Sequence, residues 1–541
     1  MAPFAVPDSG DPDPQHLQPD QRSPAQGFTG LALPGEESGA VRQGSLALSL
    51  GRSVARCEHS SAARGGAELI VAHNFHNRVE IVAGAEPAVA LPLYTDPSPK
   101  DSLAISQLAL LAVGRGEVAL VPRPIPGAID YAVSEGLIER DQIIPLDPPE
   151  ALHSLARCDL LSMAQELPVE ERVRLLGRGF VSAFTTPSIR SRAERLGMTS
   201  IQRSDSFLAD DKREFLKHAS AYGVQTCQHV EVEGPEVMPK LPPEMSRFGA
   251  WMKLSNAMGG CGIVPLEAGF TSAEVTAGLR RLKEDMRIGL AASGVFSAEA
   301  QSLIWPSEGR FSSHFGVTIE VDASCYGRKV CVASSVLELD RDGTHRTHAS
   351  FRQIIGESGE FLGSGLLNVA AVFGPELVSK LEDQYARIGL LCREELRFAG
   401  ICGVDFIVVA DERGNLDVRI IELNARPPIS ATSYIVGSLK LDAPAWRAPY
   451  LVARDPIVSM EQFEQLLVLS GRSLTRSDPE AGRITPLQFG TIAAERGGES
   501  RVLRPATWCQ VLVSGSSDAA VGELMRKVEA AGDVRFGRPD W

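Results

Sequence analysis

Residues 400–428, GICGVDFIVVADERGNLDVRIIELNARPP, are the most informative stretch of this 541-residue sequence. Two apolar runs flank ERGN, which predicts a β-hairpin. Residues two apart on a strand project to the same face, so Glu422 and Asn424 point together, and the antiparallel partner strand places Asp405 opposite them. Two carboxylates and an amide oxygen are hard ligands of the kind that Mg²⁺ prefers. The hairpin therefore predicts a magnesium site.

An ordinary solvated strand face is the alternative interpretation of these polar residues. The predicted core face of the hairpin is made of Val404, Phe406, Ile421 and Leu423. A single Asp or Glu on the opposite face would carry no functional meaning. The triple is followed at once by Arg426 and two prolines, and this combination favours a functional site.

Lys253 lies near the end of an apolar strand and is followed by Gly259, Gly260 and Gly262. Glycine lets backbone N–H groups approach a phosphate closely, so one interpretation is a mobile loop that covers phosphates. An ordinary turn is the other. The stretch does not match the G-x-x-x-x-G-K-[ST] phosphate loop.

Two more elements are weak when taken alone. Lys212 begins a predicted helix after Asp210 and Asp211, and the simplest interpretation is an N-capped surface helix. Glu320 and Asp322 share a face at the end of a strand, where carboxylates could hold a ribose or the amino edge of adenine. A solvated strand end is the alternative there.

The pattern along the chain divides it into four regions. Residues 1–43 are rich in Pro, Asp, Gln, Ser and Gly and are predicted to be a disordered tail. Residues 44–205 alternate apolar runs with helical stretches and are predicted to form an α/β domain. Residues 206–445 hold the elements described above, and residues 446–541 are predicted to be a small α+β domain. The predicted fold class is therefore α/β and α+β.

Two local predictions concern the connections within residues 206–445. Strands 315–323 and 329–340 follow each other so closely that a hairpin is predicted. The glycine-rich stretch 354–365 is predicted to be a flexible lid that excludes water.

Composition excludes some classes of protein. The formal net charge of −14 argues against a nucleic-acid-coating role, which requires a basic surface. The nine cysteines are scattered without a C-x-x-C pair, which suits a reducing compartment. No signal sequence and no apolar run of membrane-spanning length is found, so we expect a cytoplasmic protein with neither nucleic-acid nor membrane partners.

In order and spacing, the elements from Lys212 to Arg426 resemble the ATP-grasp superfamily, and IIELNARPP is the most specific match. The resemblance implies two α+β subdomains that clamp ATP. It implies the following roles: Lys212 and Lys253 contact phosphates, the loop with Gly259, Gly260 and Gly262 folds over them, Glu320 or Asp322 lies near the nucleoside, Asp405, Glu422 and Asn424 bind Mg²⁺ (or Mn²⁺), and Arg426 meets the acyl phosphate or the attacked carbonyl. Arg426 and Lys253 are the implied catalytic residues.

The segments WMKLSN, SFRQIIGESGEFLGSGLL, GVDFIVV, IIELNARPP and ITPLQFGTIAA look like peptide ligases of the pheganomycin type. Those enzymes join an amino acid carboxylate to the amine of a peptide, and this implies a pre-ATP-grasp domain over 44–205 and a homodimer. Arg352 stands where that type has an acidic residue, and NARPPISATSY replaces a basic, glycine-rich continuation. Both departures concern the predicted substrate side of the site.

The activity implied is an ATP-dependent carboxylate–amine ligase that forms an acyl phosphate and releases ADP, with small-molecule carboxylate and amine or peptide substrates, in peptide natural-product biosynthesis. Two alternatives stay open. One is an ATP-grasp enzyme that acts on a non-peptide acid or amine. The other is a non-catalytic ATP-binding regulatory protein.

Overall fold

The computed structural model describes most of the chain after the first 68 residues. The described ranges are 69–72, 79–83, 86–91, 106–114, 117–148, 160–182, 187–200, 209–234, 238–255, 262–292, 316–356, 361–469, 472–476 and 482–537. The predicted tail, residues 1–43, lies outside them.

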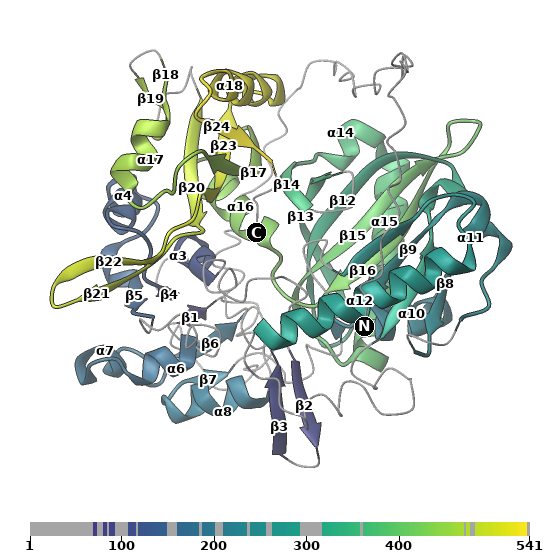
Figure 1. The fold of residues 1–541 in the computed structure, drawn as a ribbon, viewed down its shortest axis with the longest axis horizontal. Coiled ribbons are helices and arrows are strands. Elements are labelled where there is room, and N and C mark those ends of the chain that lie inside the picture. The colour runs from purple at the N-terminus through teal and green to yellow at the C-terminus, as the bar shows by residue number, and fades with distance from the viewer. Residues whose placement is uncertain are drawn as a thin grey trace, which may run out of the picture. The chain divides into compact units, whose positions relative to one another are not determined.

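A parallel sheet is formed by the first described part of the chain (Figure 1). Its strand order is β5 (Ile143–Leu146), β4 (Glu117–Pro122), β1 (Leu69–Ala72), β6 (Gly179–Ser182) and β7 (Thr199–Ser200). All four pairings are parallel, and helices such as α4 (Ala128–Ser134), α6 (Leu160–Gln165) and α8 (Pro187–Arg195) connect the strands. Buried Val118, Leu120 and Ile144 join this sheet to α6 through Leu160 and Leu161. The α/β character predicted for this region is confirmed.

A four-stranded antiparallel sheet comes next, with α10 (Lys212–Ala219), α11 (Pro243–Phe248) and α12 (Ser272–Ala292). Its strand order is β10 (Ile263–Leu266), β9 (Ala250–Leu254), β11 (Val317–Val321) and β8 (His229–Val232). Helix α12 buries Val275, Leu279 and Leu282, which follow the helical repeat, in the same core as Met252 and Ile319 of the sheet.

The largest sheet has nine strands among the described residues. Its order is β16 (Leu416–Asn424), β15 (Gly400–Ala410), β12 (Arg328–Leu339), β13 (His345–Ile355), β14 (Phe361–Leu366), β17 (Ala445–Ala453), β23 (Trp508–Gly515) and β20 (Arg483–Phe489), with β24 (Val534–Phe536) paired to β17. Helix α15 (Pro375–Leu391) packs on one face through Leu377, Leu381 and Ile388. The strands of residues 446–541 thus continue the sheet that carries the predicted metal site. The α+β character predicted for residues 206–541 is confirmed, while the division into domains stays a prediction.

Shorter elements complete the described chain. They are η1 (Ser106–Leu108), α3 (Ala109–Ala112), η2 (Arg140–Gln142), α7 (Val169–Val173), η3 (Ser220–Tyr222), η4 (Ala323–Tyr326), α14 (Val369–Phe373), the π-helical η5 (Cys392–Leu396) and η6 (Ile435–Lys440), α16 (Ile429–Tyr434), α17 (Met460–Leu466), α18 (Asp518–Ala530), and the pairs β2 (Val79–Ala83) with β3 (Glu86–Leu91), β18 (Val468–Leu469) with β19 (Arg472–Ser473) and β21 (Ile492–Arg496) with β22 (Glu499–Arg504).

The hairpin predicted between strands 315–323 and 329–340 is wrong. Strand β11 pairs with β8 and β9, whereas β12 pairs with β13 and β15, so the two strands belong to different sheets. The Asp322 side chain accepts a hydrogen bond from the backbone N–H of Ser324 and caps η4. Gly327, with φ of 147°, then redirects the chain into the second sheet.

The predicted lid over residues 354–365 is also corrected in part. Residues 354–355 end β13 and residues 361–365 lie in β14, which is hydrogen-bonded to strands on both sides. Residues 357–360 lie outside the described ranges. Gly363 is required for close packing rather than for movement, because a Cβ atom there would lie 2.7 Å from the carbonyl oxygen of Ala448 in β17.

We expect Gly363→Ala to lower the free energy of unfolding by about 3 kcal/mol, the upper end for a residue held in a region that favours glycine. Gly363 has φ of 153° and a backbone oxygen within contact distance, so both strain and overlap act. Gly414→Ala is the matched control, because Gly414 also has positive φ (84°) but has open space around the added methyl. The control should lose about 1 kcal/mol. Urea unfolding checks both values, and equal losses would show that the contact with β17 does not matter.

The hairpin of β15 and β16 forms as predicted, with one shift in register. The pairing slips between Asp405 and Phe406, so that Phe406 lies opposite Ile420. Ile420 is therefore fully buried and Ile421, expected in the core, is only partly buried. A β-bulge is a tertiary feature that strict alternation cannot predict.

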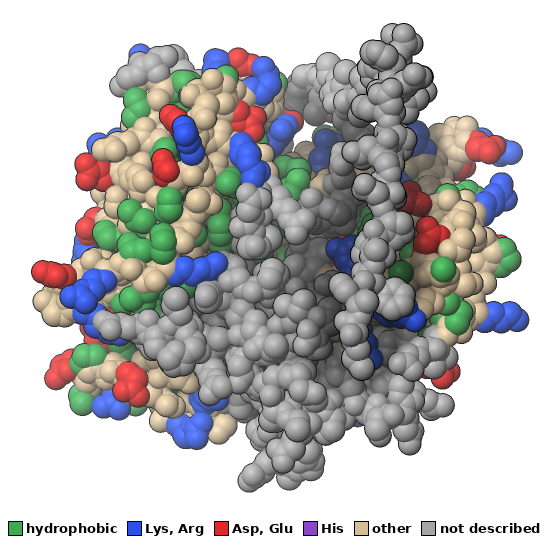
Figure 2. Space-filling model, viewed as in Figure 1, with side chains coloured by type: hydrophobic (Ala, Val, Ile, Leu, Met, Phe, Trp, Pro, Cys, Tyr) green, Lys and Arg blue, Asp and Glu red, His purple; other side chains and the backbone are tan. Residues whose placement is uncertain are grey.

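Acidic and basic side chains are interspersed over the described surface on the face shown in Figure 2. Of the described helices, none has the length and apolar character needed to cross a bilayer. The six described cysteines are free, and all but Cys325 are buried.

Candidate active site

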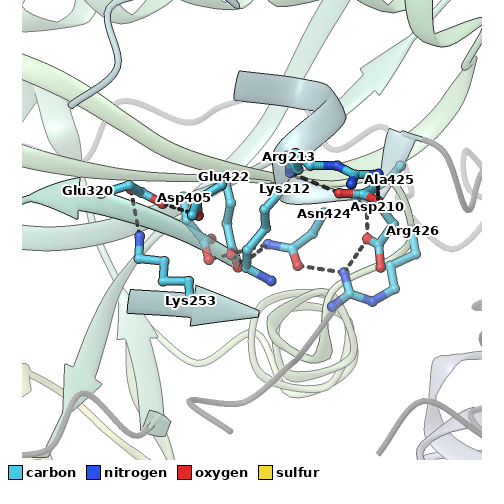
Figure 3. Close-up of polar contacts among 12 residues, drawn as sticks. Asp210, Lys212, Arg213, Lys253, Glu320, Asp405, Glu422, Asn424, Ala425 and Arg426 are labelled. Atoms are coloured by element: carbon cyan, nitrogen blue, oxygen red, sulfur yellow. Dashed lines mark hydrogen bonds and ion pairs between the residues drawn. The ribbon is translucent and has the colours of Figure 1, made fainter. Parts of the chain in front are cut away.

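Lys212 is the first residue of α10, and its side chain points toward the carboxylates of the hairpin (Figure 3). Asp211 is the N-cap residue and accepts hydrogen bonds from the backbone of Arg213 and Glu214, while the Lys212 N–H donates to the Ser255 carbonyl after β9. The Lys212 side chain is buried, and its Nζ lies 3.1 Å from Glu422 Oε2 on β16. The N-cap predicted for this helix is confirmed, but the surface position expected for Lys212 is wrong.

Lys253 reaches the same cluster from the smaller sheet. Lys253 Nζ donates to Glu320 Oε2 at 2.8 Å, and both side chains are buried. The register of β9 against β11 places Lys253 opposite Thr318, two residues from Glu320 on the same face. Burial by itself lowers the pKa of Lys253, but the carboxylates of Glu320 and Glu422 outweigh it, so the pKa lies above its usual value. Lys253 is therefore positively charged at neutral pH.

Asp405, Glu422 and Asn424 converge on one face of the hairpin, as the sequence predicts. The register places Asp405 opposite Glu422. The Asn424 Nδ2 atom donates to Asp405 Oδ2 and to Glu422 Oε1, each at 3.2 Å. Burial raises the pKa of Asp405, and the charge of Glu422 raises it further. Burial also acts to raise the pKa of Glu422, but Lys212 and Lys253 hold it well below its usual range.

Burial and the neighbouring charge of Glu422 thus raise the pKa of Asp405 to about 7, whereas Glu422 is the anionic member of the pair. A divalent cation would favour the ionised form of both carboxyls, and this donor chemistry fits Mg²⁺. Among the described residues no group of three or more His, Cys, Asp and Glu side chains forms a metal site. A site here would consist of two carboxylates, one amide and ligands from substrate or water.

Of the three predicted metal ligands, Asn424 is the one whose oxygen does not face the other two. Its Oδ1 accepts a hydrogen bond from Arg426 Nη1 at 2.6 Å, so the amide nitrogen faces the carboxylates. Coordination of a metal through Oδ1 requires the amide to rotate and to give up the contact with Arg426. Asp405 and Glu422 are therefore the stronger metal-ligand candidates.

Arg426 is held in place from two sides. Its Nη1 atom also donates to Asp210 Oδ1 at 3.0 Å, and the Ala425 N–H donates to the same oxygen at 3.0 Å. The side chain is buried, so an aspartate partner offsets the desolvation of the guanidinium. Asp210 therefore joins the start of α10 to the end of β16 and fixes the direction of Arg426.

Asp322 and Gly262 are the other described residues predicted to bind the nucleotide, and neither is hydrogen-bonded to this cluster. Asp322 accepts hydrogen bonds from Trp251 Nε1 at 2.8 Å and Lys329 Nζ at 2.5 Å, apart from the pair formed by Lys253 and Glu320. Gly259 and Gly260 lie outside the described residues. Gly262 has φ of 63°, and its carbonyl accepts a hydrogen bond from the Leu254 N–H next to the paired residues of β9 and β10.

Three residues of the site were missed by the sequence interpretation. Ser334 of β12 and Gln353 of β13 are polar neighbours of Asp405 that act to lower its pKa, and Asp210 holds Arg426. For Asp210 a signal was present. Two successive aspartates precede α10 and only one can cap the helix, so the other was available for a different role.

No family model matches the chain, and no curated protein matches it significantly. Solved structures with some similarity include biotin carboxylase from Campylobacter jejuni in a complex with β-γ-ATP (TM-score 0.48, 10% identity, 87% of this chain and 92% of that chain). L-amino acid ligase from Bacillus licheniformis has a TM-score of 0.44 at 12% identity, over 88% of this chain and 99% of that chain. N5-carboxyaminoimidazole ribonucleotide synthetase from Thermus thermophilus has 0.42 at 16%, over 74% and 93%. With TM-scores below 0.5, these likenesses carry no functional assignment, which rests on the residues of the site.

Proposed function

We propose that this chain is an ATP-grasp enzyme that joins a carboxylate to an amine and releases ADP and phosphate. One observation carries the proposal. Two buried lysines from separate elements, Lys212 and Lys253, act on one carboxylate, Glu422, which lies beside a second carboxylate, Asp405. Alternating positive and negative groups of this kind are what a metal-bound polyphosphate requires.

In this mechanism Lys212 and Lys253 hold the phosphates. Each ammonium group has three N–H donors, so it can keep its carboxylate partner and still donate to phosphate oxygens. Asp405 and Glu422 would hold Mg²⁺, which when bound neutralises phosphate charge. Lys253, Asp405 and Glu422 lie on paired strands and Lys212 lies in the first turn of α10. Because these elements hold the groups in place, little reorganisation accompanies the transfer of the γ-phosphoryl group to the substrate carboxylate.

Arg426 would then stabilise the developing negative charge on the acyl phosphate and on the tetrahedral intermediate that forms when the amine attacks. Its fixed position between Asp210 and Asn424 supports this role, since a preorganised donor is worth more than a mobile one. The finer assignment to peptide natural-product chemistry rests on the sequence resemblance.

The test is nucleotide product formation by the purified full-length chain with MgATP and pools of amino acids and short peptides. ADP and phosphate that form only when a carboxylate and an amine are both present support the proposal, and splitting the pools then identifies the substrates. AMP and pyrophosphate would indicate an adenylating enzyme and contradict it. ATP binding without turnover on any pool would favour the regulatory alternative.

A further inference from the structure

Two buried glutamines face each other on neighbouring strands of the nine-stranded sheet. Gln488 of β20 and Gln510 of β23 are paired in register and are 1% and 0% exposed. Within the described part of the chain, neither the nitrogen nor the oxygen of either side-chain amide has a hydrogen-bond partner. The Ser364 hydroxyl of β14 is buried in the same unpartnered state. Folding leaves such groups in place only where something else satisfies them.

The glutamines lie on the same face of the sheet as the candidate active site. Residues paired across strands, or two apart along a strand, share a face. Asp405 pairs with Ser334, and Ser334 pairs with Phe351. Gln353 lies two residues after Phe351 on β13 and pairs with Ser364. The connection continues through Ala448 and Tyr450 of β17 to Gln510, as the pairings of β14, β17 and β23 show. The carboxylates and the glutamines therefore lie on the same face of one continuous sheet.

The surroundings of the glutamines are aromatic. Tyr450 is directly opposite Gln510, and Trp508 lies two residues further along β23 on the same face. The Tyr450 and Trp508 rings meet edge to face at 5.8 Å, in a buried cluster that also includes Phe361. An occupant would therefore meet amide groups on one side and aromatic rings on another.

The chemistry of two free amides selects the occupant. Each glutamine offers two N–H donors and one acceptor oxygen, without charge. A carboxylate would satisfy only the nitrogens and an ammonium only the oxygens, so either would leave buried groups without partners. A neutral amide, which both donates and accepts, satisfies both. Sites of this kind strongly reject analogues that lack the matching group.

We propose that Gln488 and Gln510 form a subsite for an amide group of the substrate, either a peptide bond or a primary carboxamide. This inference rests on the proposed ligase function. Five strand spacings separate β15 from β23, which is about 24 Å along the sheet. A substrate that reacts at Arg426 and also fills the subsite is therefore extended, as a peptide is.

The test measures binding rather than turnover. N-acetylalaninamide, which carries two amides and no charge, is titrated into the full-length chain and followed by saturation-transfer NMR. Alanine, which is charged and lacks an amide, serves as the comparison ligand. We expect the wild type to bind the amide, and the double variant Gln488→Met, Gln510→Met to bind it at least tenfold more weakly. MgADP affinity, measured in the same samples, should be unchanged within twofold in the variant.

The melting temperature, Tm, distinguishes two roles for the glutamines: a binding site for a ligand, or a pair that stabilises the fold. Methionine conserves the volume and removes unpartnered polar atoms, so the double variant should keep or raise Tm. Gln384→Met is the matched control. The buried Gln384 accepts a hydrogen bond from the Gln225 N–H at 2.7 Å, so its replacement should lower Tm.

Three results would overturn the subsite: no binding of the amide to the wild type, equal binding by the variant, or a fall in Tm as large as that of Gln384→Met. The last would show that the glutamines already satisfy each other or hold a buried water. If the double variant does not fold, Gln510→Glu carries the same binding test, because it keeps the shape and removes the N–H donors. Failure of the wild type to bind MgADP would count against the proposed function separately.

Two further probes identify which substrate carries the amide. N-acetylalanine places an amide on an acid, and alaninamide places it on an amine. The one that binds more tightly when MgADP is present belongs to the substrate that reaches the subsite.

Discussion

Glu422→Gln is expected to reduce ADP formation at least about 100-fold while the fold stays intact. Loss of groups that merely orient a metal's ligands already costs 10–100-fold, and Glu422 is itself a proposed ligand. It is also the carboxylate that Lys212 contacts at 3.1 Å, and the lysines hold its pKa well below the usual range, so it is anionic at neutral pH. Glutamine keeps the size of the side chain but removes that charge. Steady-state ADP release and far-UV circular dichroism check the two halves of this prediction.

The matched control for Glu422→Gln is Glu412→Gln. Glu412 is exposed in the turn between β15 and β16, so it belongs to the same hairpin but not to the site. Binding of Mn²⁺, followed by electron paramagnetic resonance, gives a readout that does not depend on the substrates. The control should bind as the wild type does, and Glu422→Gln should bind far more weakly. Equal Mn²⁺ binding by both variants would show that the metal does not bind at this hairpin.

Arg426→Lys is expected to reduce kcat about 100-fold and to leave the KM for ATP within a few-fold of the wild type. The scale is that of one preorganised donor to a developing oxyanion. Lysine retains the charge but not the planar fork, so it cannot reproduce the contacts that Arg426 makes with Asp210 and Asn424. Substitution by alanine is avoided, since it would leave Asp210 partly buried without its cation.

Asp210→Asn is the control that separates positioning from direct action. Asparagine still accepts the hydrogen bond from the Ala425 N–H, so the end of β16 stays attached to α10. Arg426 loses only its ionic partner, and we expect about a tenfold fall in kcat, the scale of a contact that orients a functional group without touching the substrate. An Arg426→Lys variant with normal kcat and weakened ATP binding would contradict the proposed role and place the side chain on the nucleotide instead.

The hairpin could be predicted because its information is local. The alternation of Asp405, Glu422 and Asn424 along two strands and the turn ERGN are visible within 29 consecutive residues, 400–428. The contact of Lys212 with Glu422 and that of Arg426 with Asp210 join residues about 200 positions apart, and no periodicity encodes them. The resemblance implied that Lys212 and Glu422 belong to one site but not that they contact each other, and the contact of Arg426 with Asp210 was missed.

The errors have a common physical cause. Strands β11 and β12 follow each other closely and were predicted to pair, yet the choice of a strand's partner is made by whole-sheet packing. The glycines of 354–365 suggested mobility, whereas the structure requires a glycine at position 363 because β17 packs too closely for a side chain. Gln488 and Gln510 have no distinctive sequence context, and only the pairing of β20 with β23 brings them together.

Strand β14 is hydrogen-bonded to β17. The strands that carry the candidate active site and the strands of residues 446–541 therefore share one continuous set of backbone hydrogen bonds. A chain cut after residue 445 would present β14 as an open edge with unpaired N–H and C=O groups, the kind of edge that promotes aggregation. The C-terminal region is therefore not an exchangeable module. Transplanting it from another protein would also alter the sheet that supports the hairpin of β15 and β16, whereas single replacements at Gln488 or Gln510 would leave the backbone pairing in place.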